Sequence, residues 1–278
     1  MGVKTYYWNT RKVSAIRFLI DKYRHPEKKV FRYGNAGDIF NIDLIKYLYK
    51  DNPVLTTTAD NRILIVGSVL RVLEEGDIVN GIGWKGDDLS IKEKEIAGAK
   101  VFGVRGPLTR SIFEKYGADL TDLKFELDPG LLIKQVYNLD LKKSSEDQVI
   151  FIPHYRDLWV YKDQYPDGIK VINIDNKPQT IAKEILKSKV VYASSLHGII
   201  FAHALKKPCV FVAPQSEEPI FKYRDYYLSV GFDMPEPLKD IHAINFLTDI
   251  ATLPERDFTM DDFYFPDYEY LKKSNIIK

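Results

Sequence analysis

The chain has 278 residues, of which 45% are hydrophobic and 28% are charged, and its formal net charge is +1. This composition is typical of a globular protein, and the length suits two domains of about 130 residues each. A net charge this close to zero does not favour nucleic-acid binding. A single cysteine, Cys209, excludes a disulfide framework within the chain and argues against a cysteine metal cluster. Because no long apolar span or signal-peptide core is evident, we expect a cytoplasmic protein without a metal site.

The first half of the chain alternates predicted strands and helices. Apolar runs bounded by turn residues predict strands at 29–33, 62–66, 77–82, 100–104 and 125–127. Helical periodicity predicts helices at 39–49 and 108–116, the second with Pro107 at its first turn. This alternation is typical of a parallel α/β sheet.

The second half repeats the pattern after a polar stretch at residues 139–148, which we interpret as a linker. Strands are expected at 149–152, 169–174, 190–193 and 209–213, and helices at 178–188, 199–205, 220–229 and 241–251. The predicted fold class is therefore α/β, with two Rossmann-like domains, residues 1–138 and 149–253, facing each other across a cleft. The aromatic tail at 254–278 is expected to pack back on the first domain.

Two motifs of the first domain are candidates for anion binding. The turn GNAGD at residues 34–38 opens a predicted helix, so the backbone around Asn35 and Gly37 can hold a phosphate or carboxylate. A tight turn in which Asp38 caps the helix explains the same residues equally well. Arg105 follows a strand and precedes a helix, where its planar guanidinium suits a carboxylate or a phosphate.

The most informative stretch is residues 190–213, which predicts a strand, a sharp turn, a helix and a second strand. Ser194, Ser195 and His197 lie at the turn, where a helix N-terminus favours an anion. Histidine titrates near neutrality, so His197 is a candidate general acid or phosphate ligand. A buried structural histidine is the competing interpretation of the same residue.

Further cations and a second histidine follow other strands of the second domain. His154 lies in the strand-end loop IPHYRD, where structural and ligand interpretations are equally supported. Lys222 and Arg224 lie in the segment PIFKYRDYY and could close over an anion held near His197. The usual alternative for such a segment is a solvated helix face.

Taken in this order, the motifs resemble the polysaccharide pyruvyl transferase family. The matching segments span roughly residues 30–230 and comprise GNAGD, GSVL (67–70), GDIVNGIG (76–83), VRGPLTR (104–110), LDPGLL (127–132), IPHYRD, SSLHGIIFAHAL (194–205) and FKYRDYY. The resemblance implies a GT-B-like fold and transfer of a pyruvyl group from phosphoenolpyruvate to a sugar of a cell-surface polysaccharide or its precursor, forming a ketal. The implied reaction uses phosphoenolpyruvate as its donor substrate and needs no cofactor.

The resemblance also implies roles for the candidate residues, with the first domain on the acceptor side and the second on the donor side. His197 would be the general acid and Asp38 the base, and the substrate contacts would be Arg105, Ser194, Ser195, Lys222, Arg224, Asn35, Gly37 and His154. Some members carry an arginine where this chain has Ser195, so Lys222 or Arg224 is the expected substitute. A lipid-linked acceptor would bring the protein to the inner face of the membrane.

Two other functions stay open on the sequence, because a fold alone does not fix an activity. A GT-B glycosyltransferase with a nucleotide-sugar donor needs a ribose-binding carboxylate, which Glu217 or Glu218 could supply. A non-catalytic glycan-binding assembly subunit is disfavoured by the presence of His197 and the cations.

Overall fold

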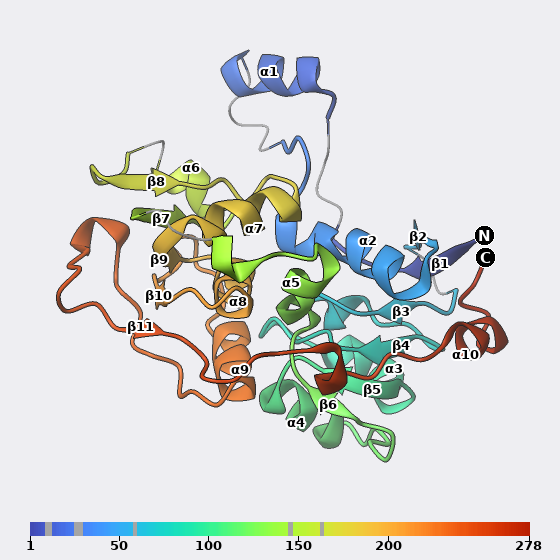
Figure 1. Ribbon diagram of the computed structural model, residues 1–278. Coiled ribbons are helices and arrows are strands. Elements are labelled where there is room, and N and C mark those ends of the chain that lie inside the picture. The colour runs from blue at the N-terminus through green and yellow to red at the C-terminus, as the bar shows by residue number, and fades with distance from the viewer. Residues whose placement is uncertain (9–12, 25–29, 58–59, 144–146, 162–163) are drawn as a thin grey trace.

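The strands of the protein form two separate sheets, of six and five strands (Figure 1). The computed structural model describes residues 1–8, 13–24, 30–57, 60–143, 147–161 and 164–278. Residue 29 of the predicted first strand and residues 144–146 of the predicted linker lie outside the described residues. In these ranges, no helix is both long and apolar enough to cross a bilayer.

The first sheet is wholly parallel, with the strand order β2-β1-β3-β4-β5-β6. Several of its strands are buried along their whole length, as expected for a parallel sheet covered on both faces. Its strands are β1 (Gly2–Thr5), β2 (Asn52–Leu55), β3 (Ile63–Leu64), β4 (Ile78–Asn80), β5 (Lys100–Val104) and β6 (Phe125–Glu126). Its helices are α2 (Ala36–Tyr49), α3 (Glu93–Ala97), α4 (Pro107–Lys115) and α5 (Ile133–Val136).

The second sheet has the order β11-β10-β9-β7-β8 and is parallel except for the pair β10 and β11. Its strands are β7 (Gln148–Ile152), β8 (Ile169–Val171), β9 (Ser188–Ala193), β10 (Cys209–Phe211) and β11 (Ala251–Thr252). Its helices are α6 (Asp157–Tyr161), α7 (Pro178–Leu186), α8 (Leu196–Ala204) and α9 (Phe221–Ser229). The two sheets confirm the predicted fold class, while the domain limits 1–138 and 149–253 stay a prediction.

The C-terminal residues lie along the first sheet. Gly2 and Lys278 exchange two backbone hydrogen bonds of 3.0 and 2.8 Å, which brings the two termini together (Figure 1). Farther from the end, Phe125 of β6 meets Phe263 edge-on, with ring centroids 5.1 Å apart. Shortly before its last residues the tail forms helix α10 (Tyr268–Lys273). Aromatic burial therefore holds this segment in place.

The largest apolar cluster contains residues of both sheets, and each sheet has a smaller cluster of its own. Helix α8 is buried on every side, as its lack of polar faces predicts, and it lies with α5 between the sheets (Figure 1). Phe201 of α8 meets Phe40 of α2 edge-on, with ring centroids 5.6 Å apart. Because apolar burial joins the domains, their relative position is set by packing and not only by the connecting chain.

One predicted strand of the first domain is wrong. The described part of the segment at 29–33 forms no strand, because the N–H groups of Arg32 and Tyr33 donate to the carboxylate of Asp175 at 2.9 and 2.8 Å. The position beside β3 is taken instead by β1, which pairs with β2 on its other side. Val3, Thr5 and Tyr6 around Lys4 are residues typical of strands, so the local pattern could have indicated this strand.

The predicted helix at 241–251 is also wrong. The segment holds a single 3₁₀ turn, Ile241–Ala243, and the antiparallel strand β11. Side chains compete here with helical hydrogen bonds, since Asp249 accepts from the N–H of Asn245 at 2.8 Å and Asn245 accepts from the N–H of Leu247 at 3.1 Å. Such local bonds favour turns over a continuous helix.

A carboxylate of the second domain caps a helix of the first. Asp225 of α9 accepts hydrogen bonds from the N–H groups of Leu108 and Thr109 at the start of α4, at 2.9 and 3.0 Å, and from the Thr109 hydroxyl at 2.6 Å. These three donors belong to a buried junction, so each would be left without its partner if the carboxylate were removed.

We therefore expect Asp225→Ala to lower the free energy of unfolding by about 1–3 kcal/mol in a urea titration. The matched control is Asp233→Ala, because Asp233 is exposed shortly after the same helix. If both variants unfold at the same urea concentration as the native protein, the Asp225 cap does not stabilise the domain junction.

Candidate active site

Helix α2 begins at the turn that the sequence marks as an anion site, and the second domain holds that turn in place. Asn35 is the N-cap, and its side-chain oxygen accepts from the N–H of Gly37 at 3.0 Å. Asp175, which follows β8, accepts from the N–H of Gly34 at 2.8 Å. The turn is thus fixed by its own cap and by a carboxylate of the other domain.

Helix α8 begins immediately after β9 and three residues earlier than predicted. Ser195 is its N-cap, and the Ser195 hydroxyl accepts from the N–H of Gly198 at 3.4 Å. This start places His197 in the first turn of α8, against the first turn of α2. A Cβ atom at Gly37 would lie 2.0 Å from Nδ1 of His197, so glycine is required for the two helix ends to approach.

Behind His197 lies a fully buried ion pair of Arg105 and Asp128, with Nε of Arg105 3.1 Å from Oδ2 of Asp128. The other oxygen of Asp128 lies 3.9 Å from Nε2 of His197 and accepts from the N–H of Gly130 at 2.8 Å. Within the described part of the chain, Nη1 and Nη2 of Arg105 and Nε2 of His197 make no hydrogen bond. The N–H groups of the Arg105 guanidinium are therefore available as hydrogen-bond donors beside the His197 imidazole.

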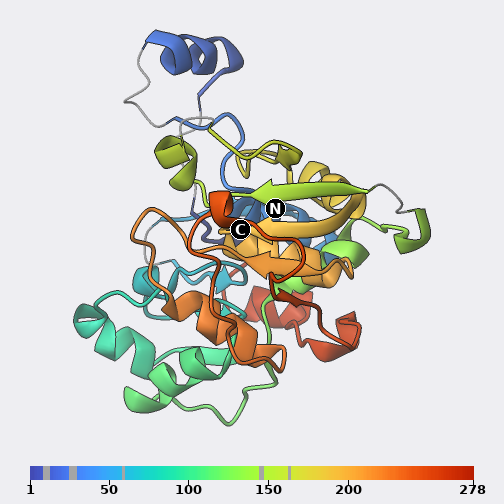
Figure 2. The ribbon, with the colours of Figure 1, turned by 90° about the vertical axis from the view of Figure 1, so that its left-hand side faces the viewer.

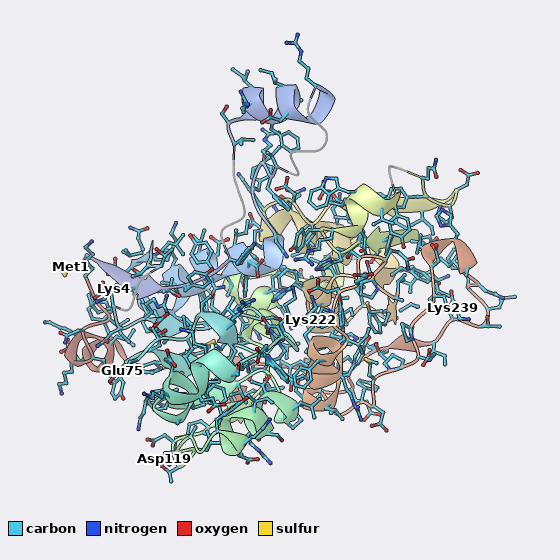
Figure 3. The ribbon with its side chains drawn as sticks, turned by 180° about the vertical axis from the view of Figure 1, so that it is seen from behind. Met1, Lys4, Glu75, Asp119, Lys222 and Lys239 are labelled. Atoms are coloured by element: carbon cyan, nitrogen blue, oxygen red, sulfur yellow. The ribbon has the colours of Figure 1, made fainter. Side chains whose placement is uncertain are left out.

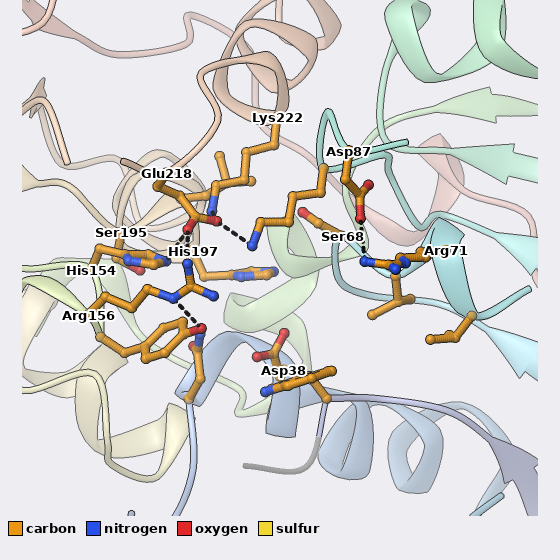
Figure 4. Close-up of a pocket in the computed structure, with 17 residues that line it drawn as sticks. Asp38, Ser68, Arg71, Asp87, His154, Arg156, Ser195, His197, Glu218 and Lys222 are labelled. Atoms are coloured by element: carbon orange, nitrogen blue, oxygen red, sulfur yellow. Dashed lines mark hydrogen bonds and ion pairs between the residues drawn. The ribbon is translucent and has the colours of Figure 1, made fainter. Parts of the chain in front are cut away.

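A pocket of about 300 Å³ opens where the two domains meet (Figure 4). Polar side chains from both domains line it. The first domain contributes Asn35, Asp38, Ser68, Arg71, Lys85 and Asp87, and the second contributes His154, Arg156, Ser195, His197, Glu218 and Lys222. Figure 3 places Lys222 near the middle of the molecule, between the two halves.

One end of the pocket gathers cations around a single buried carboxylate, Glu218. Its oxygens lie 2.6 Å from Nζ of Lys222, 3.2 Å from Nζ of Lys85 and 3.4 Å from Nη1 of Arg156. Nε2 of His154 lies 3.9 Å from the same carboxylate (Figure 4). Three positive side chains against one negative group leave this end of the pocket with an excess of positive charge.

Burial and the neighbouring charges shift the pKa values of this cluster. Burial alone would raise the pKa of Glu218, but the charge of Lys222 and its hydrogen bond lower that pKa to about 2. Burial lowers the pKa of Lys222 to about 8, which the charge of Glu218 keeps from falling further. Burial also lowers the pKa of His154, to about 3, so its imidazole is neutral near pH 7.

The pKa values of the two candidate proton carriers, Asp38 and His197, are shifted in opposite directions from their ordinary values. Burial raises the pKa of the Asp38 carboxyl to about 7, with Lys222 and Arg105 acting in the opposite direction. Burial lowers the pKa of His197 to about 4, against the opposing charge of Asp128. Near neutral pH, Asp38 therefore titrates while the His197 imidazole is neutral.

The other end of the pocket belongs to the first domain. Arg71 and Asp87 face each other there with Nη1 and Oδ2 3.8 Å apart, and Asp87 also accepts from the indole N–H of Trp84 at 3.1 Å. Trp8, half-exposed, lines the same end. Over the described ranges, no group of three or more His, Cys, Asp or Glu side chains could hold a metal ion.

The structure brings together six of the ten residues that the sequence predicts for the site: Asn35, Asp38, His154, Ser195, His197 and Lys222. Gly37, Arg105 and Ser194 lie behind the pocket wall. Ser194 there donates to Asp157 at 2.6 Å and accepts from the N–H of His154 at 2.8 Å. Arg224 lies on the exposed face of α9, outside the pocket.

The predicted site did not include five charged residues of the pocket: Arg71, Lys85, Asp87, Arg156 and Glu218. Lys85 follows β4 closely, so the strand-end rule that selected Arg105 could have found it. Glu218 was considered only as a ribose-binding carboxylate, whereas its oxygens contact Lys85, Lys222 and Arg156. Two of these partners, Lys85 and Arg156, are far from Glu218 in the sequence.

The fold and the pocket define an α/β protein with two sheets and a pocket between them that gathers positive side chains at one end. The profile described as polysaccharide pyruvyl transferase matches residues 13–216, and the chain belongs to this family. An uncharacterized protein of Acanthamoeba polyphaga mimivirus is 26% identical over 240 residues, which cover 80% of this chain and 81% of that protein.

A solved structure is also similar. It is that of an uncharacterized protein from Klebsiella pneumoniae, which is 15% identical and has a TM-score of 0.45. The match covers 81% of this chain and 98% of the bacterial one.

Of the two cations that the sequence predicts as ligands of the donor, Lys222 lines the pocket and Arg224 does not. We expect Lys222→Met to weaken the binding of phosphoenolpyruvate, measured by calorimetry, at least about tenfold, since it removes a buried charge from the pocket. Arg224→Met should leave the affinity within about twofold, because an exposed charge is screened by solvent. The reverse order of effects would mean that α9 presents its other face to the donor.

Proposed function

We propose that the protein transfers the pyruvyl group of phosphoenolpyruvate to two hydroxyl groups of a sugar, with release of phosphate. The observation that carries this proposal is the cationic end of the pocket, where Lys85, Lys222 and Arg156 converge beside the N-termini of α2 and α8. Phosphoenolpyruvate is a small molecule with a carboxylate and a phosphate, and both groups are suited to cations and to helix N-termini. Family membership supports the same donor.

The donor would lie between the cation cluster and His197. In this pose its anionic groups contact Lys222 and the N-terminal turn of α8, where Ser195 also lines the pocket. Glu218 keeps the ammonium and guanidinium groups together before the donor arrives, so little reorganisation is needed on binding. Arg105, which is behind the wall, would act on the donor through its charge and through Asp128.

In this proposal His197 gives a proton to the CH₂ carbon of the enol. Its imidazole is neutral in the empty pocket, because burial lowers its pKa to about 4. An anionic donor alongside would raise that pKa, and the carboxylate of Asp128, 3.9 Å away, acts in the same direction. Proton donation by His197 thus depends on the donor being bound.

Asp38 would accept the proton of the attacking sugar hydroxyl. It lines the pocket from the first turn of α2, opposite the cation cluster in Figure 4, and its pKa of about 7 suits a base near neutral pH. The acceptor sugar would then occupy the end formed by Arg71, Asp87 and Trp8, where an aromatic face and charged groups are available to a carbohydrate.

The chemical steps balance in atoms and charge. Protonation of the CH₂ carbon forms a methyl group, and the first hydroxyl oxygen bonds to the neighbouring carbon. The bond from that carbon to the phosphate oxygen then breaks, and a second hydroxyl oxygen takes its place to close the ketal. Of the two hydroxyl protons, Asp38 accepts the first and passes it to the departing phosphate, and the second restores His197.

A nucleotide-sugar donor has less support in the residues. Glu218, which could have bound a ribose, is already engaged by Lys85, Lys222 and Arg156. Glu217 is exposed and does not line the pocket. We therefore retain pyruvyl transfer as the single proposal.

The pKa of Asp38 predicts how activity depends on pH. As a base, Asp38 must lose its proton, so kcat/KM for the donor should rise with pH and level off above about 7. The donor phosphate also titrates, near pH ~6, so the variant Asp38→Asn is needed to isolate the contribution of the protein. We expect the variant to lose this limb and to retain donor binding. An unchanged profile with full activity would exclude Asp38 as the base.

The role of His197 is tested by His197→Asn in an assay of acceptor-dependent phosphate release from phosphoenolpyruvate. We expect turnover to fall by about 10²–10⁴-fold, the usual contribution of a general acid, with a small change in donor affinity. The matched control is His242→Asn, because the His242 side chain is half-exposed. Native turnover in a folded His197→Asn variant would contradict the proposed acid.

A further inference from the structure

Helix α1 (Ala15–Arg24) stands away from the two sheets. Both Figure 1 and Figure 2 show it above the rest of the molecule. A backbone hydrogen bond of 3.0 Å runs from the N–H of Val13, which precedes the helix, to the carbonyl of Phe31, which follows it.

The apolar face of α1 is turned outward. Ile16, Leu19 and Ile20 lie on one side of the helix at helical spacing, and their side chains are 74%, 55% and 39% exposed. On the opposite side Asp21 is buried, and Nε of Arg17 donates to its carboxylate at 2.9 Å. This is the reverse of an ordinary surface helix, whose apolar side faces the core.

The sequence around α1 is strongly basic. Residues 11–32 contain eight lysines and arginines and two acidic residues, a formal charge of +6 in a chain whose total is +1. The rest of the protein is therefore acidic on balance. A helix with exposed apolar side chains in a basic segment has the features of one that lies in the interface of an anionic membrane.

Described residues on both sides of α1 in the sequence line the active-site pocket. Trp8 precedes the helix and Asn35 follows it, and both are lining residues. Phe31 packs edge-on against Tyr155, a further lining residue, with ring centroids 5.6 Å apart. The segment that contains α1 is therefore flanked on both sides by residues of the pocket.

We propose that α1 docks the protein on an anionic lipid surface, with Ile16, Leu19 and Ile20 inserted among the headgroups. Lipid binding itself follows from the helix and its charge. Its use, which is to deliver a lipid-linked sugar to the pocket, rests on the proposed pyruvyl transfer.

A second copy of the chain is a less suitable occupant of this face. Pairing α1 with itself would bring two segments of charge +6 together, and like charges repel. A ten-residue helix is also only about 15 Å long, which is short for a stable interface of about 800 Å² on each partner. An anionic bilayer satisfies the charge and the apolar face together.

The test is sedimentation of the full chain with vesicles of phosphatidylcholine containing phosphatidylglycerol, compared with phosphatidylcholine alone. We expect binding to the anionic vesicles, weakening as salt is added, and little binding to the neutral ones. The triple variant Ile16→Ser, Leu19→Ser, Ile20→Ser should lose at least about tenfold in vesicle affinity. The matched control replaces three other exposed apolar residues, Phe246, Leu247 and Ile250, by serine and should bind as the native chain does.

Equal binding by the α1 variant and the native chain, or no binding to anionic vesicles, would overturn the proposal. A native dimer that becomes monomeric in the α1 variant, in sedimentation equilibrium, would assign the face to a second copy instead. Pyruvyl transfer to a water-soluble sugar should be unaffected by the α1 changes. A failure of the proposed reaction and a failure of lipid docking would thus be seen in separate assays.

Discussion

The structure depends on the close approach of two helix N-termini from different domains. The first turn of α8 places His197 against Gly37 in the first turn of α2, where a Cβ atom would lie 2.0 Å from the imidazole. Around this contact the apolar core is continuous from one sheet to the other, with Phe40 on Phe201. The pocket is consequently assembled from both domains, and its geometry is inseparable from the packing that joins them.

Electrostatics then determine what the pocket can hold. Glu218 keeps Lys85, Lys222 and Arg156 within 3.4 Å of its carboxylate, so the positive charge is organised before any ligand binds. Burial brings the pKa of Asp38 up to about 7 and that of His197 down to about 4. An anion entering beside them would change both proton affinities, and this links donor binding to the proposed proton transfers.

The sequence predicted the parts of the structure that local pattern determines. Strand β5 and the start of α7 at Pro178 fall where expected, because apolar runs and helix-starting proline are local signals. Strand β1, which pairs with β2 and β3, was missed although Val3 and Thr5 favour a strand, because Lys4 interrupts its apolar pattern. In the site, turn residues such as Asn35 were found, whereas Glu218 acquires its partners only in the folded chain. The sequence could not show that Lys222 is buried while Arg224 is exposed, because it does not give the direction of each side chain.

The most direct test of the account is the heat of phosphoenolpyruvate binding to the native protein, compared with that of nucleotide sugars. We predict one phosphoenolpyruvate bound per chain, with affinity that falls as salt screens Lys222 and its neighbours, and no comparable heat from nucleotide sugars. Binding of a nucleotide sugar, with none of phosphoenolpyruvate, would contradict it and would assign the pocket to sugar transfer.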